Sequence, residues 1–295
     1  MSQAAFEAFW DGLDQGLAGI PVDATLERDG FYSQPEWAVY RMRYNSLDGE
    51  SLFAWLSVPS QSQGSPIPVV VRMPDYASVH DIIYTPLRHH AVIMNASHRG
   101  QRNTDASLQA RYPGLLTEGI DRPESYVMRR VFADALRAVD AVQRLPEVAV
   151  GPLALVGSGL GASLALTTAA RRPGISAVAA DTPLALGRPD ALEGNPPYPL
   201  GELNDYLRLN PDQEQVVRDS CAPLDLLQVA TRITLPVLLS LGNRDRGQCP
   251  LAIGEELAGL LPQCDLRVYD GGSEGGGHEH RMVRESWLRE QLGIP

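Results

Sequence analysis

A short run of small residues has the pattern of a turn that presents a catalytic nucleophile. After the apolar residues 153–156, the chain continues as Gly157-Ser158-Gly159-Leu160-Gly161 and then enters a helical pattern. In a G-x-S-x-G turn between strand and helix, the central residue carries the attacking hydroxyl. The flanking glycines allow the strand and the helix to approach closely. The central position here is Gly159, so the turn lacks its attacking atom.

Ser158 could act as the nucleophile only if the frame shifted by one residue. The shift would place Val156 and Leu160 at the two positions that need small residues, where their side chains would crowd the turn. The expected role of Ser158 is therefore packing on the flank of the elbow. We keep Gly159 as the central position.

The same segment also fits a dinucleotide-binding fingerprint. Gly157, Gly159 and Ala162 follow a strand pattern, and Asp181 ends the next one about twenty residues later. A Rossmann unit usually begins at the first strand of its sheet, whereas several predicted strands precede this one. The sequence therefore favours the hydrolase elbow over the nucleotide site.

Two downstream residues supply the other groups that a hydrolase elbow needs. Asp245 follows the apolar residues 236–241, and His278 lies between Gly277 and Glu279. The order of elbow, acid and histidine is that of the α/β-hydrolase fold. The acid keeps one imidazole nitrogen protonated so that the other can accept a proton. The histidines without this placement are expected to have surface or structural roles: His80, His89, His90, His98 and His280.

Alternating strand and helix patterns must position these residues. The expected strands are 41–44, 51–58, 68–72, 91–95, 153–156, 175–180, 236–241 and 266–269, and the expected helices are 1–16, 126–145, 162–170, 251–261 and 282–292. The Asp48-Gly49 turn predicts an antiparallel N-terminal hairpin. The later alternation predicts a mainly parallel sheet covered on both faces. We expect a single α/β-hydrolase domain over residues 1–295, with a lid or oligomer contact inserted at about 183–223.

The composition excludes several classes of function. A formal charge of −11 with no basic run disfavours nucleic acid as a partner. The first residues lack the pattern of a signal peptide and no run of about 18 apolar residues occurs, so we expect no membrane association and a cytoplasmic protein. The three cysteines have neither CxxC nor zinc spacing. We therefore expect no metal and no cofactor.

With these residues assembled, the chain resembles the acetyl xylan esterase and cephalosporin C deacetylase family of carbohydrate esterases over nearly its whole length. The matching pieces include Phe9-Trp10, Arg99-Gly100-Gln101, residues 113–117, Gly119-Ile120, Tyr126, residues 129–132, Asp134, Asp181, Pro183, residues 236–238, Cys249-Pro250 and Gly277-His278-Glu279. The resemblance implies that Asp245 and His278 are triad members and that the backbone N–H groups of Tyr76 and Leu160 form the oxyanion hole. It also implies that the Arg99-Gly100-Gln101 motif braces the loops around that hole.

The resemblance carries further expectations about ligand and assembly. It implies a small-molecule substrate, an acetylated sugar or another acyl compound. It also implies a homo-oligomer, either a dimer or a hexamer built from dimers.

The departures from the family lie where the chemistry is. The family's Gly-x-Ser-Gln-Gly-Gly elbow appears here as residues 157–162, without the serine and the glutamine. The family's His-Gly-Tyr motif before the oxyanion hole is Pro74-Asp75-Tyr76 in this chain. The family's Asp-x-Arg-Gly-Gln-Gly motif corresponds to residues 97–102, where Ser97 replaces the aspartate and Arg102 replaces the last glycine. Several coordinated differences favour natural divergence over a single engineered change.

Three functions fit these residues. In the first, a water occupies the space vacated by the serine, and His278 oriented by Asp245 acts as its general base on an ester or acyl substrate. In the second, the chain is a non-catalytic pseudo-esterase that uses the old pocket for binding or assembly. In the third, the histidine and the oxyanion hole serve a non-hydrolytic proton-transfer or lyase step. Arg72 and Asp75 near the hole could bind a charged substrate, although loop residues of this kind are more often surface ion-pair partners.

Overall fold

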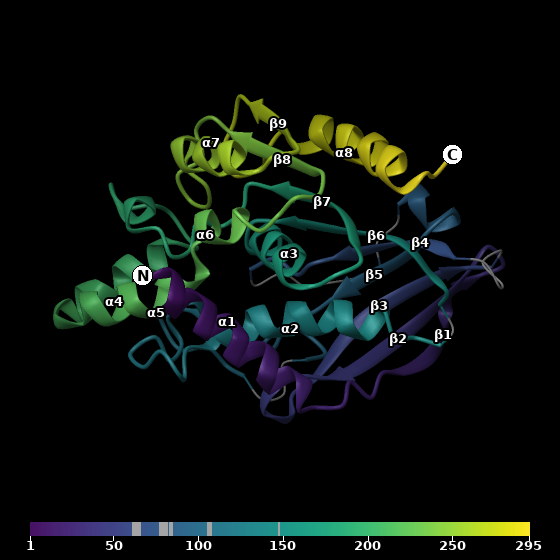
Figure 1. The fold of residues 1–295 in the computed structure, drawn as a ribbon, viewed down its shortest axis with the longest axis horizontal. Helices are drawn as coiled ribbons and strands as arrows, with labels where there is room; N and C mark the ends of the chain where they lie inside the picture. Colours follow the sequence, from purple (N-terminus) through teal and green to yellow (C-terminus); the bar gives the residue numbers. More distant parts are fainter. Residues whose placement is uncertain (61–65, 77–81, 83–84, 105–107, 147) are drawn as a thin grey trace.

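A computed structural model describes residues 1–60, 66–76, 82, 85–104, 108–146 and 148–295 (Figure 1). The strands of these residues form a nine-stranded sheet in the order β1-β2-β3-β5-β4-β6-β7-β8-β9. The sheet begins antiparallel and continues parallel, with helices against it. The α/β-hydrolase fold class predicted from the sequence is confirmed.

The antiparallel part of the sheet is a meander of β1 (Thr25–Gln34), β2 (Trp37–Asn45) and β3 (Ser51–Pro59). The predicted hairpin is the pair β2 and β3, and its turn holds Asp48 and Gly49 at φ angles of 62° and 75°. Strand β1 was not predicted. Its sequence is largely polar and it lies at the exposed edge of the sheet, so it lacks the alternation that marks a half-buried strand.

The parallel part of the sheet aligns the carboxyl ends of its strands at one edge. Its members are β5 (Val92–Ala96), β4 (Ile67–Arg72), β6 (Val150–Ser158), β7 (Ile175–Asp181), β8 (Val237–Gly242) and β9 (Cys264–Tyr269). In an open α/β sheet, ligands bind outside this edge. The loops after β4, β6 and β8 therefore meet where the sequence places the site.

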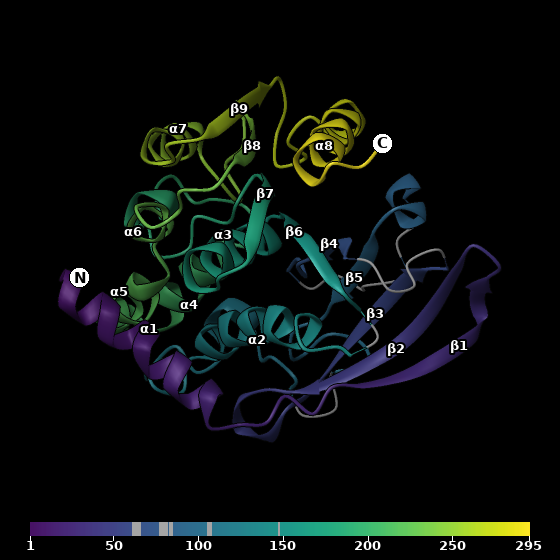
Figure 2. The ribbon, with the colours of Figure 1, turned by 45° about the vertical axis from the view of Figure 1, so that its right-hand side comes forward.

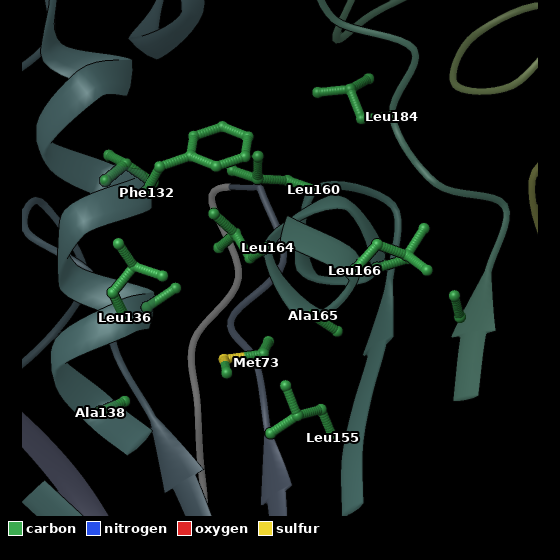
Figure 3. Packing of buried hydrophobic residues seen from close by; sticks show 14 of the residues in the cluster. Met73, Phe132, Leu136, Ala138, Leu155, Leu160, Leu164, Ala165, Leu166 and Leu184 are labelled. Atoms are coloured by element: carbon green, nitrogen blue, oxygen red, sulfur yellow. The ribbon is translucent and has the colours of Figure 1, made fainter. Parts of the chain in front are cut away.

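Helices cover both faces of the sheet, as Figure 2 shows for α2 and α3 on one side and α8 on the other. The first face packs against α1 (Gln3–Ala18), α2 (Val127–Val142), α3 (Leu160–Arg171), α6 (Leu226–Ala230) and α7 (Leu251–Leu260). Figure 3 shows Phe132 and Leu136 of α2 beside Leu160 and Leu164 of α3 in this core. The second face packs against α8 (Gly277–Leu292), whose Leu288 is buried there.

Alternate side chains of each parallel strand face the two cores. In β6, Leu155 lies in the core under α3, whereas Ala154 and Val156 lie in the core under α8. By the same alternation, Ser158 at the end of β6 belongs to the α8 side.

The segment predicted as an insertion, at about 183–223, contains α4 (Gly201–Leu209) and α5 (Glu214–Cys221), and α6 follows it. Helix α8 begins at Gly277, five residues before its predicted start, so His278 lies in its first turn. No helix of the described residues is long and apolar enough to span a membrane.

Candidate active site

The turn between β6 and α3 has the strained backbone of an elbow. Gly159 adopts φ 55° and ψ −122°, a conformation that favours glycine. A Cβ atom on Gly157 would lie 2.1 Å from the carbonyl oxygen of Gly161, and one on Gly161 would lie 2.8 Å from that of Met73. Both contacts are with backbone oxygens, so neither flanking position has room for a side chain.

The carboxylate of Asp75 lies in the predicted oxyanion hole. Its Oδ1 accepts hydrogen bonds from the backbone N–H of Tyr76, at 2.7 Å, and of Leu160, at 3.0 Å. These are the two donors that the family resemblance implies for the hole. Leu160 also begins α3, so the negative charge sits at the positive end of a helix.

Asp75 and Gln248 together occupy the space beside Gly159. A Cβ atom built on Gly159 would lie 2.5 Å from Asp75 Oδ1 and 2.4 Å from Gln248 Oε1. The Gln248 oxygen is buried and has no hydrogen-bond partner among the described residues. Two polar side chains therefore converge on the predicted nucleophile position.

The acid groups of this pocket are shifted towards neutral pH. Burial raises the pKa of Asp75 to about 6, against the opposing effect of the Leu160 N–H and the charge of Arg72. Burial likewise raises the pKa of Glu202 to about 7. Glu202 accepts a hydrogen bond from the Tyr76 hydroxyl, so Tyr76 contacts both carboxyl groups. Carboxyl groups shifted in this way often mark functional sites.

The Arg99-Gly100-Gln101 motif connects the loop after β5 to the Asp75 loop. Arg99 donates to both oxygens of Asp134 on α2, at 2.8 and 2.7 Å. Gln101 Nε2 donates to the backbone carbonyl of Asp75 at 2.9 Å. These bonds hold the loop whose carboxylate enters the hole.

The predicted acid and histidine are both present but are not joined by a hydrogen bond among the described residues. Asp245 is buried, and its Oδ1 accepts from the backbone N–H of Gly247 at 2.9 Å, its Oδ2 from that of Cys249 at 3.1 Å. His278 is exposed, and its Nδ1 contacts Arg281 at 2.5 Å. In this conformation Asp245 stabilises its own loop.

A different histidine is paired with an acid on the α8 side of the sheet. His280 Nε2 lies 2.9 Å from Asp181 Oδ1, and Tyr269 Oη lies 3.1 Å from His280 Nδ1. Arg284 donates to the other oxygen of Asp181. Burial would raise the pKa of Asp181, but the His280 hydrogen bond and the Arg284 charge hold it below its usual value.

Ser158 adjoins this group without completing a triad. Its Oγ lies 3.5 Å from Asp181 Oδ2, so the acid stands between the serine and the histidine. A triad needs the histidine in the middle, where it can take the proton of the hydroxyl. The geometry gives Ser158 no activating base.

Sequence reasoning missed the groups that fill the pocket. It noted Asp75 only as a charged loop residue, and it assigned no role to Gln248 or Glu202. The one available signal was Asp75 itself, a carboxylate directly before a predicted oxyanion donor. His80 lies outside the described residues, and within the described ranges no group of three or more His, Cys, Asp or Glu side chains could hold a metal ion.

Comparison with known proteins relates the chain to acetyl xylan esterases. A family model described as acetyl xylan esterase (AXE1) matches residues 1–290. An acetyl esterase, Axe7A, from Xylanibacter ruminicola is 24% identical over 259 residues, which cover 83% of this chain and 57% of that protein. The chain thus spans little more than half the length of this relative.

Two solved structures with similar folds are acetyl xylan esterases. The acetyl xylan esterase from a Paenibacillus species superposes with a TM-score of 0.86 at 25% identity, over 98% of this chain and 95% of that one. Acetyl xylan esterase 1 from a Thermoanaerobacterium species gives a TM-score of 0.84 at 20% identity, over 96% and 93% of the two chains.

Proposed function

The chain belongs to the acetyl xylan esterase (AXE1) family, and from that premise we propose that it is a pseudo-esterase, which binds its ligand without forming an acyl-enzyme. The observation that carries the proposal is the hydrogen bonding of Asp75 Oδ1 to the N–H groups of both Tyr76 and Leu160. The family relationship suggests a small acetylated molecule as the ancestral substrate.

Ester hydrolysis needs those two donors for the oxygen on which charge develops. One donor of an oxyanion hole contributes about 10²–10³-fold to the rate. A substrate carbonyl must first displace the Asp75 carboxylate, and any charge left nearby repels the developing oxyanion. Gly159 offers no hydroxyl for a covalent intermediate. Both features favour binding over acyl transfer.

The two catalytic alternatives need the same donors. Hydrolysis by a water that His278 activates requires Asp75 to leave the hole. It also requires His278 to turn from Arg281 towards Asp245. A lyase step through an enolate requires the same vacant hole. Both alternatives remain hypotheses, and a hydrolysis assay distinguishes the water-activating mechanism from the proposed pseudo-esterase.

The test is hydrolysis of p-nitrophenyl acetate and acetylated xylose by the parent protein and by the His278→Ala variant. We expect both proteins to hydrolyse at the same background rate, because neither forms an acyl-enzyme. Turnover by the parent that falls in the His278→Ala variant would instead support the water-activating mechanism.

A second set of variants tests whether Asp75 closes the site. Gly159→Ser alone should stay at background, because the new side chain starts 2.5 Å from Asp75 Oδ1. Gly159→Ser combined with Asp75→Gly and Gln248→Ala frees the hole and the space beside residue 159, and we expect hydrolysis at least about tenfold above the single variant. Activity of Gly159→Ser alone that is above background and equal to that of the triple variant would show that neither side chain blocks the pocket.

A further inference from the structure

A groove beside the vacated site is lined by three arginines. It encloses about 730 Å³ between the segment before and within α4 and the loops that follow β8 and β9. Arg208 comes from α4, and Arg244 and Arg246 flank Asp245 in the loop after β8. The chain has a formal charge of −11, and this groove brings three of its cations together.

The charges of these arginines are only partly neutralised. Arg246 donates to the backbone carbonyl of Gly194 at 2.9 Å and has no carboxylate partner among the described residues. Arg244 lies 3.4 Å from Asp270, with both side chains more than two thirds exposed. Exposed pairs of this kind contribute little stabilisation.

The acids that line the groove are already engaged. Asp205 pairs with Arg208 at 2.8 Å and accepts a hydrogen bond from the Tyr198 hydroxyl at 2.6 Å. The Asp245 carboxylate accepts from backbone N–H groups of its own loop, Gly247 and Cys249 among them. Arg246 thus lines the groove without a carboxylate partner among the described residues, and Arg244 has only the exposed pair with Asp270.

A second arginine-lined hollow shows the contrast. It encloses about 720 Å³ near the end of α1 and contains Arg171 and Arg172. There Arg171 meets Asp14 at 2.5 Å, and Arg172 meets Asp14 at 2.6 Å and Asp140 at 2.8 Å. The charges of Arg171 and Arg172 are thus neutralised by ion pairs, whereas Arg246 has no carboxylate partner among the described residues and Arg244 has only the exposed pair with Asp270.

The backbone that carries these two arginines is fixed. The Arg244 N–H donates to the carbonyl of Gly271 at 2.8 Å, and the Asp245 carboxylate ties the residues that follow. Planar guanidinium groups on a fixed loop suit bidentate recognition of carboxylate or phosphate. A preorganised loop also loses less entropy when a ligand binds.

We propose that this groove binds a small organic anion through its carboxylate or phosphate groups, held by Arg244 and Arg246. The exposed ring of Tyr198 lines the same groove and offers a surface for the organic part of the ligand. The inference does not depend on whether the chain hydrolyses esters. It assigns a ligand class to a surface separate from the oxyanion hole.

Isothermal titration at constant ionic strength tests the proposal, with citrate as the carboxylate probe and pyrophosphate as the phosphate probe. We expect the parent protein to bind at least one probe with a Kd below about 1 mM. Binding of citrate alone identifies a carboxylate site, binding of pyrophosphate alone a phosphate site, and binding of both the shared chemistry. Each of these three results supports the proposal.

The Arg244→Gln/Arg246→Gln variant should lose at least about tenfold in affinity, because each charge-assisted pair is removed. Arg122→Gln is the matched control, since Arg122 is equally exposed and lies outside the groove. Failure of both probes to bind the parent would overturn the proposal. Retained affinity in the double variant, or an equal loss in Arg122→Gln, would overturn it as well.

Discussion

Residues 158 and 159 are neighbours in the chain, but they adjoin two differently held carboxylates. Next to Gly159, Asp75 is bound by the backbone N–H groups of Tyr76 and Leu160. Next to Ser158, Asp181 is bound by the side chains of His280 and Arg284. Both carboxylates are largely shielded from water, yet their pKa values move in opposite directions.

The difference lies in what compensates the buried charge. Around Asp181, a histidine and a guanidinium from α8 stabilise the ionised form more than burial destabilises it. Around Asp75, burial outweighs the two N–H donors and the more distant charge of Arg72. The Asp181 group therefore fastens α8 to the sheet, whereas Asp75 is a charge that the fold retains at a cost. A buried carboxylate with a raised pKa is typical of a functional site, whereas a carboxylate stabilised by ion pairs is typical of a structural contact.

Removing the charge of Asp181 is expected to give the largest effect. Asp181→Asn leaves the Arg284 guanidinium without its acid, and breaking a buried ion pair costs about 3–5 kcal/mol of the free energy of unfolding. Asp75→Asn is the matched control, because it neutralises a carboxylate whose pKa is raised by burial rather than lowered by its partners. Urea denaturation at pH 7.5 measures both. Equal losses in the two variants would contradict the proposed difference.

The second largest expected effect is on the pH dependence of the free energy of unfolding, to which Asp75 and Asp181 should contribute with opposite signs. The folded-state pKa of Asp75 is raised from near 3.8 to about 6, so the native state binds more protons than the unfolded state between these values. Its contribution to stability is therefore full below pH 4 and is lost as the pH rises to about 6, by about 1–3 kcal/mol. Asp181 has a lowered pKa, so its contribution is present above pH 4 and is lost on acidification.

Unfolding free energies measured from pH 4 to pH 8 test this assignment. In Asp75→Asn, the decrease between pH 4 and pH 6 should become smaller. The decrease that remains, from about pH 4.5 to about pH 7, belongs to Glu202, whose pKa is also raised. A parent protein whose stability rises steadily across this range, with no change in the variant, would contradict the raised pKa of Asp75.

The central fold could be predicted because short stretches of the sequence carry the patterns of its strands and turns. Apolar runs such as residues 153–156 mark strands buried on both faces, and the contact of the Gly157 backbone with Gly161 leaves room for glycine alone. The pocket was harder to foresee. Asp75 and Leu160 are 85 residues apart, and Gln248 comes from a third loop, so their meeting depends on how three loops pack.

The histidines show how a small shift in a helix start changes an assignment. With α8 expected from residue 282, His278 was the natural partner for an acid and His280 was assigned a surface or structural role. With α8 beginning at Gly277, His280 joins Arg284, Leu288 and Leu292 at a spacing of four, along one face of the helix. That stripe was readable in the sequence, and it places His280 on the sheet.

Ser158→Ala should have the smallest effect and completes the comparison. Its hydroxyl lies 3.5 Å from Asp181 Oδ2, at the limit of a hydrogen bond, and Asp181 keeps its His280 and Arg284 partners without it. We expect a change in unfolding free energy within about 0.5 kcal/mol. Ser46→Ala is the control, because Ser46 is fully buried and donates to Asp134 at 2.6 Å, so its loss should cost about 1–3 kcal/mol. If Ser158→Ala costs as much as Ser46→Ala, the serine is an integral member of the Asp181 group, and the α8 side has more in common with a catalytic arrangement than the distances imply.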